Sequence, residues 1–113
     1  MSLPLKTSDA APTYALYRLT AKELKLRYYF LAAFNDVAKP EWAMRLAVCE
    51  ATDELKKAGA SVEAVIARVK YIAAIPVAFH YRFGYADAHS RLMHTVTKAT
   101  SLCIERYFED VSD

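Results

Sequence analysis

Apolar residues recur along this chain with the 3.6-residue period of amphipathic helices, in four successive segments. Each segment begins with a helix-start signal: Thr20 and Glu23 have the spacing of a capping box, and Pro40 suits a first helical turn. Ser61 and Asp87 are good N-caps for the two later segments. The pattern therefore predicts four helices, over residues 20–38, 40–58, 61–75 and 88–110.

Helix-breaking residues divide these segments. Gly59 ends the second predicted helix and Pro76 ends the third, so the connections are short. Short connections place consecutive helices antiparallel, which predicts an all-α fold, a four-helix antiparallel bundle. Residues 1–12 are expected to form a flexible leader, and residues 13–113 a single helical domain.

Two of the predicted helices carry more apolar surface than one bundle core needs. The segment 20–38 is apolar around most of its circumference, and the segment 40–58 has a second apolar patch, which includes Cys49, opposite its main stripe. A helix with two apolar faces needs two neighbours. We therefore expect a homodimer that completes or extends the bundle, with an interface containing Phe30, Phe34, Trp42 and Leu46.

The composition supports helices and gives no sign of a highly charged partner. The 113 residues include 20 alanines and only two glycines, which favours helices over structures rich in tight turns. The formal net charge is +2, too small to demand a polyanion. Cys49 and Cys103 are not in a metal-ligand spacing, and no segment has the pattern of a signal peptide or a membrane span. We expect a cytoplasmic protein with reduced thiols and no membrane association.

No catalytic or metal-binding constellation emerges from the sequence. His89 and His94 are about 140° apart around a helix, so they cannot bind one metal ion together. His94 lies on the polar side near Lys98, and no HExxH, GxGxxG or Walker sequence is present. The sequence therefore predicts no metal, no cofactor and no enzymatic activity.

An aromatic segment over residues 77–87 is the strongest local candidate for a site. Aromatic side chains combined with arginine and histidine are enriched at protein–protein hot spots and in small-molecule pockets. The same pattern is typical of a connection that packs its own aromatic residues over the end of a bundle. The candidate ligand- or partner-binding residues are His80, Tyr81, Arg82, Tyr85 and His89.

Three functions are compatible with these observations. The first is a small non-enzymatic helical module that self-associates and docks other proteins. The second is a small-ligand-binding or regulatory domain that uses the aromatic segment. The third is DNA binding through residues 51–75, which have the outline of a helix-turn-helix but little basic surface, so nucleic acid is the weakest of the three.

Overall fold

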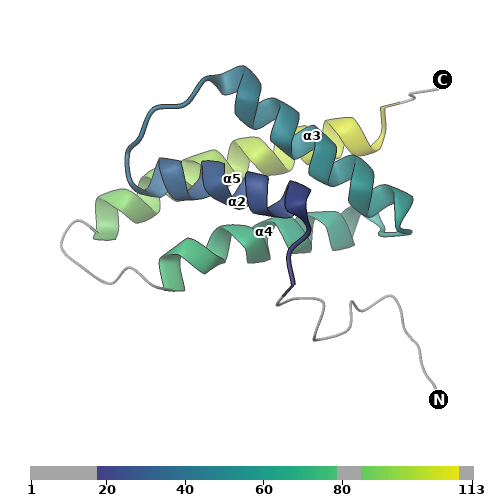
Figure 1. The fold of residues 1–113 in the computed structure, drawn as a ribbon, viewed down its shortest axis with the longest axis horizontal. Coiled ribbons are helices and arrows are strands. Elements are labelled where there is room, and N and C mark those ends of the chain that lie inside the picture. The colour runs from purple at the N-terminus through teal and green to yellow at the C-terminus, as the bar shows by residue number, and fades with distance from the viewer. Residues whose placement is uncertain (1–17, 79–84, 110–113) are drawn as a thin grey trace, which may run out of the picture.

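The computed structural model describes residues 18–78 and 85–109, and every regular element in these two ranges is a helix (Figure 1). The predicted all-helical fold is confirmed for this part of the chain. The helices are α2 (Ala21–Phe34), α3 (Glu41–Lys57), α4 (Val62–Ala78) and α5 (Tyr85–Tyr107).

The four helices pack against one another, and consecutive helices run in opposite directions in Figure 1. Helices α2 and α5 contact each other, and each also packs closely against both α3 and α4. Helices α3 and α4 contact each other only slightly, so they flank the central pair. Each flanking helix therefore buries one face against α2 and α5, and among the described helices none covers its opposite face.

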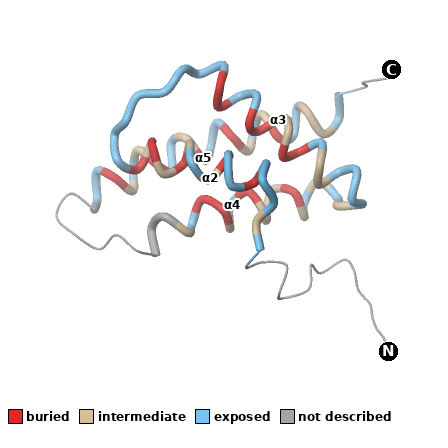
Figure 2. The backbone as a smooth tube through the Cα atoms, in the orientation of Figure 1, coloured by how far each residue is buried: buried red, intermediate tan, exposed pale blue. Residues whose placement is uncertain are grey.

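The core lies between the facing stripes of the helices (Figure 2). In α4 and α5 the buried positions follow the helical period that the sequence shows. The buried hydroxyl of Thr52 donates a hydrogen bond to Cys103 Sγ over 3.3 Å, so this polar group is satisfied inside the core. The largest fully buried apolar side chains are Leu26, Phe30, Val48, Val65, Val69, Ile72 and Leu92.

The first two helices end in the same kind of turn, although only one of them contains glycine. The expected end of the second helix at Gly59 is confirmed, with φ at 100°. Helix α2 ends at Phe34 rather than at residue 38, because Asp36 adopts a left-handed φ of 60°. The Val37 N–H then donates to the carbonyl of Ala32 over 2.8 Å, which closes a Schellman turn. This stop leaves no clear signal in the sequence, because aspartate adopts the left-handed conformation much less often than glycine.

The end of α4 and the start of α5 both differ from the prediction. Helix α4 continues through Pro76 to Ala78, so the expected stop at Pro76 is wrong. A proline removes one backbone hydrogen bond, and in the last turn few further bonds depend on it. Helix α5 begins at Tyr85, which places Asp87 in its first turn rather than at the N-cap. Its carboxylate there still complements the positive end of the helix dipole.

Arg91 of α5 holds the end of α2 in place. Its Nε donates to the carbonyl of Ala33 over 3.2 Å, and its Nη2 donates to the carbonyl of Phe34 over 2.8 Å. Carbonyls in the last turn of a helix have no partner within that helix. The arginine therefore satisfies two of these acceptors and fixes the connection to α3 against α5.

Candidate functional site

Most of the aromatic segment predicted as a site falls outside the structural description. His80, Tyr81 and Arg82 belong to residues 79–84, which lie outside the described ranges. Tyr85 is the first residue of α5, and His89 lies one turn later, partly buried. The structure therefore places two of the five candidate residues on the same helix, and the proposed ligand-binding role of the segment stays a prediction.

The four residues predicted for a dimer interface separate into two pairs. Phe30 and Phe34 are 0% and 4% exposed, so they are part of the core of a single chain and offer no surface to a second copy. The sequence could not distinguish this core role from an interface role, because both bury an aromatic ring. Trp42 and Leu46 are 69% and 46% exposed, on the side of α3 that faces away from the bundle.

Four residues spaced by four, three and four positions form the outer face of α3: Trp42, Leu46, Cys49 and Asp53. At about 100° per residue they lie within a sector of about 60° around the helix. The main stripe of the same helix, which includes Ala47 and Ala51, is buried on the opposite side. The two-faced pattern predicted for this helix is thus present, with the second face open to solvent.

The two thiols of the chain have different environments. Cys49 is partly exposed on the outer face of α3, whereas Cys103 is fully buried. Burial raises the pKa of both thiols above the ordinary value, so both are protonated at neutral pH. Cys49 is consequently the thiol that a reagent or a second molecule can reach.

The outer face of α3 ends in an ion pair and has a basic and an acidic residue beside it. Arg106 donates two hydrogen bonds to the carboxylate of Asp53, of 2.9 Å and 2.7 Å. These bonds hold the pKa of that carboxyl below its ordinary value. Arg45 lies on one side of the face and Glu50 on the other, as their positions along the helix require. The Glu50 carboxylate is 3.8 Å from Lys25 Nζ, a loose surface contact.

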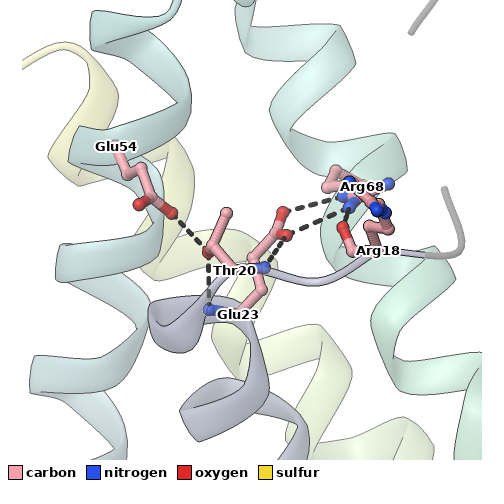
Figure 3. Close-up of polar contacts among 5 residues, drawn as sticks. All are labelled: Arg18, Thr20, Glu23, Glu54 and Arg68. Atoms are coloured by element: carbon pink, nitrogen blue, oxygen red, sulfur yellow. Dashed lines mark hydrogen bonds and ion pairs between the residues drawn. The ribbon is translucent and has the colours of Figure 1, made fainter. Parts of the chain in front are cut away.

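A polar cluster around the buried Glu23 ties the start of α2 to α3 and α4 (Figure 3). Glu23 is 1% exposed, and its two carboxylate oxygens accept hydrogen bonds from Arg68 Nε over 2.7 Å and Nη2 over 3.0 Å. The backbone N–H of Thr20 also donates to Glu23, and the hydroxyl of Thr20 donates to Glu54 over 2.6 Å. Arg68 Nη2 further donates to the carbonyl of Arg18.

This cluster has the features of a structural junction. A buried carboxylate is a general candidate for acid–base chemistry. Here three donors engage both oxygens of Glu23, and the hydrogen bonds between Arg68 and this carboxylate raise the pKa of the guanidinium, which stays charged. The sequence revealed the capping box of Thr20 and Glu23, which the structure confirms. Arg68 and Glu54 were missed, because pairing over such distances leaves no periodic signal.

The cluster also bears on the DNA-binding alternative. A recognition helix needs basic side chains that are free to reach phosphates and bases. Arg68 would be a main basic residue of that helix, and its guanidinium is instead directed to Glu23 inside the bundle. Lys70 remains exposed on α4. The helix-turn-helix interpretation therefore loses one of the few contacts that the sequence offered.

Within residues 18–78 and 85–109, no three or more His, Cys, Asp and Glu side chains come together as possible metal ligands. None of the helices in the described part of the chain is long and apolar enough to cross a membrane. Comparison with protein-family models, with curated proteins and with solved structures finds no significant match.

Proposed function

We propose that this protein is a small non-enzymatic helical module that self-associates as a dimer through the outer face of α3. The observation that carries the proposal is the exposure of Trp42, at 69%, next to Leu46, at 46%. Tryptophan is among the residues most enriched at interaction hot spots. Since α3 already buries its main stripe within the bundle, a second neighbour is the simplest use of this second face.

The spacing of the outer face favours a helical partner. Trp42, Leu46, Cys49 and Asp53 follow the alternating steps of four and three residues that define a coiled-coil seam. In heptad terms they occupy d, a, d and a positions. The seam is about three turns long and ends at Asp53, whose charge is held by Arg106. A short seam of this kind fits a modest, reversible contact.

The charges beside the seam favour a second copy of this chain in a parallel arrangement. In the same heptad register Arg45 is a g position and Glu50 is the e position five residues later. In parallel dimers a g residue lies beside the e residue of the next heptad on the partner, and opposite charges there are favourable. Two copies would form this pair twice. An antiparallel pairing would instead bring g beside g and e beside e.

The mass of the protein in solution tests the proposal. Size-exclusion chromatography with light scattering at tens of micromolar should give twice the chain mass of 12.7 kDa. Trp42→Ser should raise the dissociation constant by about 30-fold, the effect of losing a hot spot of about 2 kcal/mol. Met93→Ser removes another exposed apolar side chain, on α5, and as the control should leave the dimer intact. A monomeric mass for the unmodified protein would disprove self-association.

Cross-linking at Cys49 tests whether the two α3 helices pair in parallel. A parallel seam brings the two Cys49 thiols together, so a short bismaleimide should link two chains in high yield. Cys103 is fully buried and should not react, and Cys49→Ser should abolish the cross-link. A dimeric mass without cross-linking at Cys49 would contradict the parallel arrangement of the two α3 helices.

A further inference from the structure

A pocket of about 250 Å³ opens beside the connection between α2 and α3. Its walls come from the second half of α2, from that connection, from the first turn of α3 and from the middle of α5. These parts are far apart in the sequence. Arg91 holds the end of α2 against α5 and thereby stabilises the shape of the pocket.

The inner wall of the pocket is apolar. Ala32 and Met44 line it and are 7% and 9% exposed, and the neighbouring Ala33 and Tyr29 are partly buried. Tyr29 packs edge-on against the ring of Tyr28, with ring centres 5.2 Å apart. A wall of alanine, methionine and tyrosine side chains favours the apolar body of a ligand over a hydrated inorganic ion.

The rim of the same pocket is mainly basic. Lys39 comes from the connection before α3, and His94 and Lys98 come from one face of α5, one helical turn apart. The one carboxylate in the lining belongs to Glu41, which lies 3.8 Å from Lys98. Both side chains of that pair are well exposed, at 63% and 46%, so the contact is weak and an incoming anion can replace it.

We propose that this pocket binds a small organic anion, a carboxylate or a phosphate monoester on a compact apolar body. The body would lie against Ala32 and Met44, and the anionic group would lie between Lys39 and Lys98. The volume is below the roughly 300–1,000 Å³ of pockets for drug-sized ligands, which limits the body to about the size of one ring. Lys39 is also 4.9 Å from the centre of the Tyr28 ring, which keeps its ammonium near the rim.

Titration of the full chain with four probes, followed by calorimetry and by the NMR signals of His94 and Thr95, tests this assignment. Phenyl phosphate and benzoate carry the ring with each of the two anionic groups, inorganic phosphate carries the anion alone, and benzylamine carries the ring with a positive charge. We expect saturable binding of phenyl phosphate, benzoate or both, and much weaker binding of the other two probes. Which of the two anions binds more tightly identifies the head group.

Charge-removing variants locate the binding. Lys39→Gln and Lys98→Gln should each weaken binding of the ring-bearing anion by roughly tenfold, the change that corresponds to about 1.4 kcal/mol. Lys70→Gln removes an exposed charge on α4, outside the pocket, and should leave binding unchanged. The same titration with Trp42→Ser separates this site from self-association, because binding should persist in a monomeric variant.

Three outcomes would overturn the assignment. The first is a lack of saturable binding by both ring-bearing anions. The second is equal binding of benzylamine, which would show that charge plays no part. The third is equal weakening by Lys70→Gln and Lys98→Gln, which would show a general response to net charge rather than a site.

Discussion

Two helix faces with similar sequence patterns differ in burial: one lies in the core and the other is exposed to solvent. The inner face of α2, formed by Glu23, Leu26, Phe30 and Phe34, is almost completely buried. The outer face of α3, led by Trp42, is largely exposed. Both contain large apolar side chains at helical spacing, and the buried face even includes a charged residue while the exposed face includes the only tryptophan.

The difference arises from the number of neighbours that each helix has. Helix α2 contacts all three other helices, so its surface is covered from several directions. Helix α3 is at the side of the bundle, packed closely against α2 and α5 and only slightly against α4, and no other described helix covers its far side. Burial thus follows position in the bundle, and a charged residue such as Glu23 can be buried where a complete set of partners is available.

The largest contrast is expected between Phe30→Ala and Trp42→Ala. Phe30 is fully buried, so its truncation should lower the free energy of unfolding by about 4 kcal/mol through lost burial and a cavity. Trp42→Ala should change it by less than about 0.5 kcal/mol, because the ring lies in solvent. Urea denaturation at a concentration low enough to keep the protein monomeric measures both. Similar losses for the two variants would contradict the placement of these faces.

A smaller loss is expected from breaking the buried ion pair of the inner face. Glu23→Gln leaves the Arg68 charge without its counter-charge in a largely buried site and should lower the free energy of unfolding by about 3 kcal/mol. Glu105→Gln, on the exposed side of α5, is the control and should have little effect. Glu23→Met combined with Arg68→Met should recover most of the loss, because no unpaired charge remains. An unchanged stability for Glu23→Gln would rule out a stabilising junction.

The smallest effect on stability is expected from acid, acting on the Asp53–Arg106 ion pair at the end of the outer face of α3. Arg106 lowers the pKa of Asp53 from its ordinary value of 3.8, so the folded state binds this proton less tightly than the unfolded state. The stability from the pair is therefore present above about pH 4 and is lost as the pH falls through the lowered pKa. Since Asp53 is about half exposed, we expect less than about 1 kcal/mol. The difference in unfolding free energy between the natural protein and Asp53→Asn should shrink as the pH falls from 6 to about 2.5. A difference that grows over this range would contradict a lowered pKa of Asp53.

Parts of the candidate sites could be predicted from the sequence, and parts could not. The second apolar face of α3, with Trp42 and Leu46, follows from the periodicity alone. The pocket beside Lys39 does not, because its walls come from segments that the sequence keeps far apart. His94 and Lys98 were recognised as neighbours on a polar helix face, yet nothing local indicates that Lys39 lies across from them.

The sequence by itself determined the helices, their approximate limits and the stripes of each helix that can be buried. These properties depend on residues within about four positions of one another, since the backbone bonds and side-chain contacts of a helix are local. The tertiary structure decided which stripes are covered, and it placed Phe30 inside and Trp42 outside. It also joined Glu23 to Arg68, because the stability of that pair depends on the packing of α2 against α4 and on the exclusion of water between them.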